Sequence, residues 1–274
     1  MDDRMKQKRL GVSFSPELME AWKNIQDYVD VVEISNISDL YDIKENWTYH
    51  FTRTKNGEAV NLLKPEAIKK HFNREEIKNV LNKKSPEIVS LHLGYPAEVF
   101  KKGVYDYPIS ENVGRSEAIE KFSESLDYLT EFSEVPVAVE NLDYYGNGAY
   151  EYICEPEFIN ELLNKNKDVY LLLDISHAEV SAVELGDEIP ENRLETTRKY
   201  LDKLPLERVI EIHINSPILK NNKLMDTYHL PITDVEVAIL KNLLDLPNLD
   251  VVNLECKEKI FEQLKELVPL VKGK

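Results

Sequence analysis

The stretch Val169-Tyr-Leu-Leu-Leu-Asp-Ile-Ser-His177 tells most about the fold class of this 274-residue chain. Its first five residues are almost continuously apolar, which is typical of a strand buried on both faces, as in a parallel sheet covered by helices. The run ends at Asp174, and a histidine follows three residues later. This pattern indicates an α/β protein with reactive side chains at the carboxyl end of its strands.

Similar short apolar runs recur along the whole chain and alternate with segments of helical periodicity. We interpret the runs as eight strands: Leu10–Ser15, Val31–Ser35, Trp47–Thr52, Ile88–Gly94, Val135–Asn141, Val169–Ile175, Val209–Asn215 and Val251–Cys256. Eight strand–helix units that fill the chain predict a single-domain (β/α)8 TIM barrel over residues 1–274. A doubly wound open sheet is the alternative.

Helix signals fill most of the intervals between these strands. We predict helical segments over Pro65–Lys84, Ser116–Phe132, Pro190–Leu204, Thr233–Leu244 and Glu258–Val271. A further helix is predicted to begin at Glu155-Pro156. The interval 37–44 is short for a helix, and His71 is expected on the surface of the first long helix.

Charge and composition limit the class of partner. The formal net charge is −16, from 50 acidic and 34 basic residues, so tight nonspecific binding to nucleic acid is not expected. Two cysteines without CxxC spacing indicate no disulfide framework, and no apolar stretch is long enough to cross a membrane. We therefore expect a cytoplasmic enzyme with a small-molecule or peptide substrate; the sequence does not indicate its oligomeric state.

Most of the histidines lie where a TIM barrel has its active site, at the carboxyl ends of the strands. Of the six in the chain, His50, His92 and His213 lie late in predicted strands, His177 lies just after one, and His229 lies in the loop after the seventh. Random scatter rarely places five of six at one face. The census therefore indicates a site at the carboxyl ends of the strands.

Three carboxylates occupy equivalent positions. Glu140, Asp174 and Glu255 each end an apolar run, where an unpaired charge is costly to bury. Each alone could pair with a basic side chain or cap a helix. Together with the imidazoles they suit a shared divalent cation, whether iron, zinc or manganese, and the lack of thiolates argues against a structural zinc site.

The order of these residues resembles a known group of proteins. His92, Glu140, Asp174-x-x-His177, His213, Asp226, His229 and Glu255 follow one another as in the xylose-isomerase-like barrels, which include endonuclease IV and the sugar isomerases and epimerases. Within that group the chain looks most like the multinuclear non-haem iron-dependent oxidases of methanobactin and related peptide biosynthesis. Glu157-Phe-Ile-Asn-Glu-Leu-Leu and Asp226-Thr-Tyr-His-Leu-Pro-Ile are among the segments that carry this resemblance.

The resemblance implies two to three divalent metal ions, with iron favoured and zinc or manganese possible. It assigns His50, His92 and Glu140 to one position, Glu140, Asp174, His213 and Glu255 to a second, and His177, Asp226 and His229 to a third. The chain departs from the oxidases at His177, where they have Asn, and in the two residues between Asp226 and His229, where one is usual.

Other residues near the strand ends are predicted to serve the substrate or the ligands. Glu33, Asn141, Tyr145, Asn215 and Tyr228 form this set, with Asn141 and Asn215 also placed to orient ligands. Glu33 is as well placed to orient a ligand as to bind one. The loop 95–108 is long enough to cover the mouth as a lid.

Four functions are compatible with this set. The first is an iron-dependent oxidase that uses O2 to modify a peptide or thiol. The second is a one-metal sugar isomerase or epimerase in which Glu140 and Glu255 move protons. The third is a zinc phosphodiesterase like endonuclease IV, favoured by the Asp-x-x-His that ends at His177. The fourth is a peptide-binding scaffold with a vestigial site.

Overall fold

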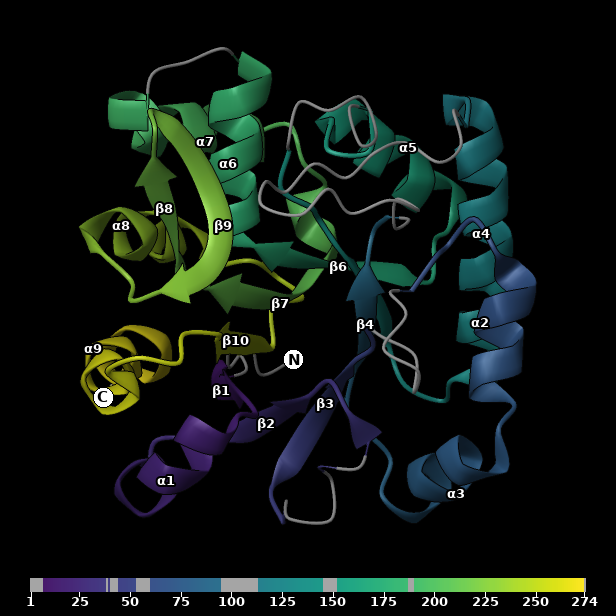
Figure 1. Ribbon diagram of the computed structural model, residues 1–274, viewed down its shortest axis with the longest axis horizontal. Helices are drawn as coiled ribbons and strands as arrows, with labels where there is room; N and C mark the ends of the chain where they lie inside the picture. The colour runs from purple at the N-terminus through teal and green to yellow at the C-terminus, as the bar shows by residue number, and fades with distance from the viewer. Residues whose placement is uncertain are drawn as a thin grey trace, which may run out of the picture.

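Eight parallel strands close into a barrel with helices outside it (Figure 1). The strands are β1 (Arg9–Ser13), β2 (Val31–Ile34), β3 (Asn46–His50), β4 (Val89–His92), β5 (Val137–Glu140), β6 (Val169–Asp174), β7 (Val209–Ile214) and β10 (Val251–Leu254). They follow one another around the barrel in chain order, and β10 pairs with β1 to close it. The predicted TIM barrel is thus confirmed, and the open sheet is excluded. This computed structural model describes residues 7–37, 39, 44–52, 60–94, 113–144, 152–186 and 190–273.

Nine α-helices belong to the described residues. They are α1 (Pro16–Ile25), α2 (Pro65–Phe72), α3 (Glu75–Lys83), α4 (Arg115–Phe132), α5 (Pro156–Lys165), α6 (Ile175–Gly186), α7 (Arg193–Leu201), α8 (Asp234–Leu243) and α9 (Ile260–Lys272). Their apolar faces and the outer faces of the strands form one continuous core, in which a fully buried Leu, Ile or Phe contributes about 1.5–3 kcal/mol. None of these helices is long and apolar enough to span a bilayer.

The helices differ from the prediction in three places, and α1 is the first, because no helix was predicted between the first two strands. The expected helix from Pro65 to Lys84 is two helices, because the chain turns at Asn73, where α2 ends. Helix α6 was not predicted, and it begins at Ile175, directly after β6, with no intervening loop. Most of the interval 37–44 lies outside the described residues.

An antiparallel hairpin follows β7, where the sequence predicted only a loop. It consists of β8 (Ser216–Lys220) and β9 (Lys223–Leu230), and it packs along α6 (Figure 1). Its two-residue turn, Asn221 and Asn222, has positive φ angles of 52° and 61°. Asn tolerates this left-handed region better than most residues, and two such residues match the twist of a tight hairpin.

A buried ion cluster joins the helices next to this hairpin. The Arg193 guanidinium at the start of α7 lies 3.1 Å from Glu179 of α6 and 3.2 Å from Glu236 of α8, and both carboxylates are fully buried. Glu236 also closes a capping box with Thr233 at the start of α8. One guanidinium therefore contacts two buried carboxyls and fixes three helices to one another, while burial and Glu236 hold the pKa of Glu179 well above its usual value.

The barrel interior is defined by alternation along the strands. Successive side chains of a strand point to opposite faces, so residues two apart share the interior. A register shift against β6 leaves Ile210 of β7 without a partner, so Glu211 pairs with Leu172 and His213 with Asp174. This bulge keeps both Glu211 and His213 inside the barrel.

Candidate metal centre

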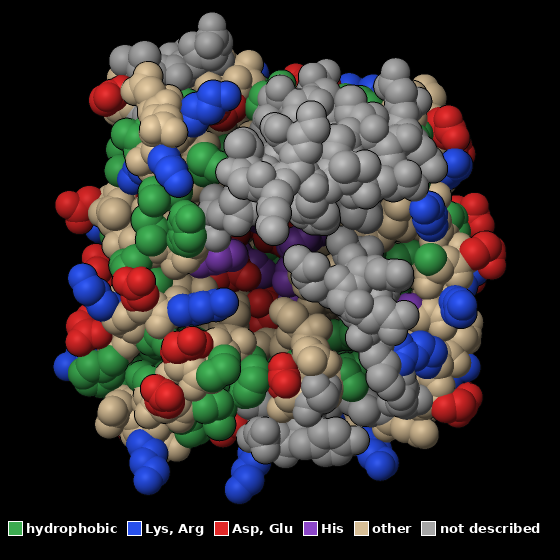
Figure 2. Space-filling view, viewed as in Figure 1, with side chains coloured by type: hydrophobic (Ala, Val, Ile, Leu, Met, Phe, Trp, Pro, Cys, Tyr) green, Lys and Arg blue, Asp and Glu red, His purple; other side chains and the backbone are tan. Residues whose placement is uncertain are grey.

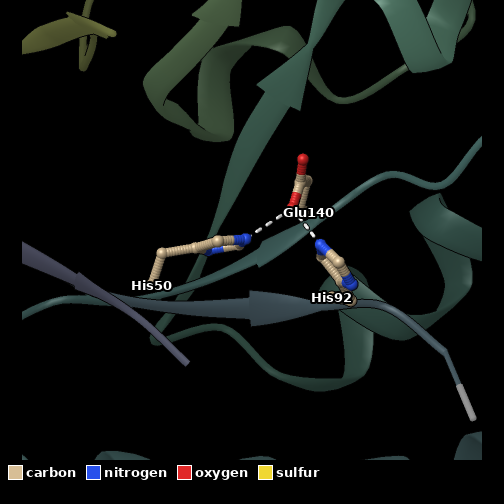
Figure 3. Close-up of side chains that lie close together, drawn as sticks. All are labelled: His50, His92 and Glu140. Atoms are coloured by element: carbon tan, nitrogen blue, oxygen red, sulfur yellow. Dashed lines mark ion pairs between the residues drawn. The ribbon is translucent and has the colours of Figure 1, made fainter. Parts of the chain in front are cut away.

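The interior residues at the carboxyl ends of the strands form one polar cluster. In Figure 2, histidine and acidic side chains lie at the bottom of a hollow in the face of the molecule. The described residues of the cluster are Glu33, His50, His92, Glu140, Asp174, His177, His213, Asp226, His229 and Glu255. Figure 3 shows its most compact part, in which His50 and His92 point at Glu140 from two neighbouring strands.

Glu140 is central to the cluster. Its Oε2 lies 3.1 Å from Nε2 of His50 and 3.1 Å from Nε2 of His92, while its Oε1 lies 3.5 Å from Nδ1 of His177 and 3.6 Å from Nδ1 of His213. Burial alone would raise the pKa of this carboxyl, but His92 and His50 hold it well below its usual value. Each oxygen thus faces a different pair of imidazoles, which is the geometry required of a bridging ligand.

A second group centres on Asp174 and His213. Oxygens of Glu140 and Asp174 and a nitrogen of His213 lie within 4.8 Å of one another. Glu255 joins the group through a 3.3 Å contact between its Oε1 and Nδ1 of His213. Burial and the negative charges of Asp226, Glu140 and Glu255 outweigh His177 and raise the pKa of Asp174 to about 8. Such crowding of buried carboxylates calls for cations or protons between them.

A third group consists of Asp174, His177 and Asp226, whose ligand atoms also lie within 4.8 Å of one another. Nδ1 of His177 lies 2.8 Å from the Asn141 carbonyl, which fixes the ring so that Nε2 is 3.3 Å from Asp226. The Asp174 carboxylate accepts a 2.7 Å hydrogen bond from the His177 amide. This accounts for the Asp-x-x-His spacing, because Asp174 also caps the start of α6.

His229 lies nearer to Glu255 than the resemblance implied. Its Nδ1 is 3.1 Å from Oε2 of Glu255, which raises the pKa of His229 to about 9 against the effect of burial. Asp226, not His229, completes the group around His177. His229 therefore connects the hairpin to the Glu255 side of the cluster.

The hairpin explains how Asp226 and His229 reach the same mouth although they are three residues apart. Between the paired positions Ser216–Leu230 and Ile218–Met225, β9 has more residues than β8 and bulges. Within this bulge His229 has a φ of 45°, a left-handed conformation rare for residues other than glycine. The extra residue between the two ligands is thus accommodated by the backbone, and strain of this kind often marks a functional site.

Two predicted site residues, Asn141 and Asn215, hold ligands in place. The side-chain amide of Asn141 accepts a 2.9 Å hydrogen bond from the backbone N–H of Asp174 and donates one of 3.0 Å to its carbonyl. The side-chain amide of Asn215 donates a 3.0 Å hydrogen bond to the Asp226 carboxylate. Both asparagines are fully buried. These bonds hold the backbone of Asp174 and the carboxylate of Asp226, and the orienting role of the two asparagines stays a prediction.

The remaining predicted residues are placed less centrally. Glu33 is buried beneath His213, at 2.7 Å from its Nε2. The side chain of Tyr228 is 58% exposed. Tyr145 and the loop 95–108 lie outside the described residues.

The prediction that His71 lies on a helix surface is wrong. The ring is buried, with its centroid 4.2 Å from that of Phe51. Burial lowers its pKa to about 4, so the imidazole is neutral and packs as an aromatic side chain. The ring is buried because it lies on the face of α2 that packs inward.

Sequence reasoning also missed a polar layer just below the ligands. Most of its residues come two positions before a site residue on the same strand, so they also point into the barrel, and one pairs with Glu33 across neighbouring strands. The layer consists of Ser13, Thr48, Ser90, Glu211 and Asn253. The Ser90 hydroxyl, for example, lies 2.9 Å from Nδ1 of His50. Alternation traced back from each ligand would have identified these residues.

The donor set fits divalent cations. Buried atoms of the described cluster that make no hydrogen bond include Oε2 of Glu140, Oδ2 of Asp174, Nδ1 of His213 and Nδ1 of His229. Native proteins rarely leave so many buried polar atoms unsatisfied. Imidazole and carboxylate donors suit zinc, iron and manganese. Fold and site together thus define a metal-dependent TIM-barrel enzyme.

Comparison with known proteins gives the family. Residues 10–269 match the model of the RiPP precursor modification enzymes MbnB/TglH/ChrH, and the chain belongs to this family. A UPF0276 protein of Acaryochloris marina is 26% identical over 157 residues, which are 57% of this chain and 52% of that protein. A UPF0276 protein of Caulobacter vibrioides is 32% identical over 101 residues, 37% of this chain and 33% of that protein. The matches thus span about half and a third of these curated relatives.

Solved structures show the same fold at low identity. A 3-keto-D-glucoside 4-epimerase of E. coli superposes with a TM-score of 0.53 at 14% identity, covering 96% of this chain and 99% of the epimerase. Endonuclease IV of Thermus thermophilus gives a TM-score of 0.52 at 14% identity, covering 94% and 99%. At this identity the likenesses show a shared TIM-barrel fold.

Proposed function

We propose that this protein is an iron-dependent oxidase that holds two to three metal ions and modifies a cysteine-containing peptide or a small thiol with O2. The observation that carries the proposal is the shared Glu140 carboxylate, whose two oxygens face two different pairs of imidazoles. The family supports the substrate class, because its members modify ribosomally made precursor peptides. Iron would supply redox chemistry and an open coordination position for the thiolate.

The residues would divide into three metal positions that share ligands. His50 and His92 with Glu140 hold the first, Glu140, Asp174 and His213 with Glu255 hold the second, and Asp174, His177 and Asp226 hold the third. Sharing Glu140 and Asp174 keeps the ions close together, as multinuclear sites require.

Exposure indicates the side from which the substrate enters. The His92 side chain is 42% exposed and that of His229 is 36% exposed, whereas those of His50 and His213 are nearly inaccessible. A substrate thiolate would therefore approach between His92 and His229. Glu255, between His213 and His229, is placed to accept the thiol proton.

The test is metal content and oxygen consumption of protein prepared without air. Elemental analysis of the anaerobically purified protein should give two to three irons per chain. Addition of air and a cysteine-containing peptide should give O2 uptake that depends on iron, followed by an electrode, with the peptide product identified by mass. Absence of both iron and iron-dependent O2 uptake would refute the oxidase.

A zinc phosphodiesterase is the second candidate, because His177 and Asp226 meet beside Asp174. Three tightly held zincs, with cleavage of a small phosphodiester, would favour it. The net charge of −16 disfavours a DNA duplex as its substrate. A single manganese per chain would instead favour an isomerase.

A further inference from the structure

Glu33 lies on the far side of His213 from the metal ligands. The carboxylate is 1% exposed, and its Oε2 is 2.7 Å from Nε2 of His213. The other ring nitrogen, Nδ1, faces the cluster, at 3.3 Å from Glu255 and 3.6 Å from Glu140. The imidazole is therefore held between an acid below and the proposed metal position above.

Glu33 is itself fixed from the neighbouring strands. Its Oε1 accepts a hydrogen bond of 2.8 Å from the Ser13 hydroxyl, and that hydroxyl accepts one of 2.8 Å from the Asn253 amide. Glu33, Ser13 and Asn253 come from β2, β1 and β10, so the chain of contacts crosses three strands. With Oε1 engaged in this way, Oε2 is directed at His213.

A neutral histidine carries its proton on one nitrogen and binds a metal through the other. A carboxylate beside Nε2 favours the tautomer that is protonated there and leaves the Nδ1 lone pair for a cation. We infer that Glu33 is a positioning residue, which fixes the orientation and tautomer of His213 and so strengthens cation binding at the position formed by Glu140, Asp174 and His213. This inference rests on the proposed metal centre and deepens it.

Glu211 offers a competing explanation for the same contacts. Ligand atoms of Glu33, Glu211 and His213 lie within 4.8 Å of one another, so a cation could also be held among them, below the mouth. The 2.7 Å between Oε2 of Glu33 and Nε2 of His213 is an ion-pair contact that is not aligned as a hydrogen bond, and it is shorter than the contacts of Nδ1 with Glu255 and Glu140, which favours the positioning role. Glu211 serves as the matched control, because it is a buried glutamate in the same layer, two residues before His213.

The experiment measures Zn²⁺ affinity of metal-free protein against a competing chelator, with Glu33→Gln, Glu33→Leu and Glu211→Gln. We expect all three variants to keep the wild-type number of zincs. Loss of an outer-shell partner typically weakens binding about 10–100-fold, so Glu33→Leu should show this loss at one position, and Glu33→Gln a smaller one, since its amide oxygen still accepts a hydrogen bond. Glu211→Gln should bind as the wild type does.

A spectroscopic measurement separates positioning from general destabilisation. In zinc-loaded wild-type protein labelled with ¹⁵N, His213, assigned by its loss in His213→Gln, should carry its proton on Nε2. Far-UV circular dichroism should show each variant folded. If Glu33→Leu does not fold, Glu33→Gln still decides the question.

Three results would overturn the inference. One is wild-type zinc affinity in Glu33→Gln and Glu33→Leu, and another is a proton on Nδ1 of His213. The third is loss of one zinc equivalent in both Glu33→Gln and Glu211→Gln, which would place a cation between these residues. Failure of the wild type to bind any zinc or iron would instead refute the proposed centre itself. Absence of O2 uptake by an iron-loaded protein would refute only the oxidase.

Discussion

Replacing Glu140 by glutamine should affect two of the three proposed metal positions at once. The variant keeps the shape of the side chain but removes the charge and turns one oxygen into an NH2 group, which cannot bind a cation. In the wild type one oxygen faces His50 and His92, and the other faces His177 and His213. One metal position therefore loses its ligand atom, and the other keeps a neutral amide oxygen in place of a charged one.

The size of the effect follows from this geometry. Losing a direct ligand should weaken each affected position by at least the ~100-fold that marks the upper end of outer-shell losses, or about 2.7 kcal/mol. The group of Asp174, His177 and Asp226 does not use Glu140 and should keep its ion. We expect the metal content to fall from three ions per chain to about one, because only this one group keeps all its ligands.

The assay is elemental analysis after anaerobic desalting, with Glu255→Gln for comparison. Glu255 contacts His213 and His229, so its loss affects only the second position and should remove at most one ion. Far-UV circular dichroism would confirm that both variants are folded. Glu140→Gln protein that still holds three ions after desalting would refute a bridging role for Glu140.

Further predictions concern stability. Arg193→Met leaves Glu179 and Glu236 buried without a cation and should lower the free energy of unfolding in urea by about 3–5 kcal/mol, much of which Glu179→Leu should restore in the double variant. His229→Gly should be more stable than His229→Ala by about 1 kcal/mol, because φ is 45°; equal stabilities would contradict strain there. The pKa of His229 is raised to about 9 from 6.5, so its stabilisation of the metal-free protein is complete below pH 6.5 and lost as pH rises to about 9. The melting temperature without metal should fall over that range, while the increase produced by Zn²⁺ should grow, since metals bind deprotonated ligands. A metal-induced increase that shrinks as pH rises would contradict the assignment.

The barrel could be predicted from the sequence because its strands are buried on both faces. Runs such as Val169–Leu173 are apolar without interruption, and this pattern has few other interpretations. Once eight strands are placed, the carboxyl ends of all of them meet at one mouth, so Glu140, Asp174 and His213 converge by topology alone. This is why most of the candidate site followed from the sequence.

The remaining features depend on local geometry that periodicity does not record. The bulge at Ile210 interrupts the alternation of β7, so Glu211 is predicted inside the barrel only when the alternation is counted back from His213 and not forward from Val209. The hairpin was missed because its strands mix apolar and charged residues, although Asn221-Asn222 is a recognisable turn signal. His71 was misplaced because its helix buries the ring against Phe51, a tertiary contact. The contact of His229 with Glu255 was also not predicted, because it depends on the left-handed backbone conformation of His229 itself.

Because of the hairpin, the proposed metal ligands should fall into two classes with different exchange kinetics. Ligands on β3 to β7 belong to the closed barrel and can leave their places only when the barrel opens. Asp226 and His229 belong to β9, which among the described strands pairs with β8 alone and packs along α6. Such a unit can open locally at a lower free energy than the whole fold. Metal exchange next to Asp226 should therefore follow hairpin opening and be faster than exchange beside His50, so the ions of one site would differ in residence time.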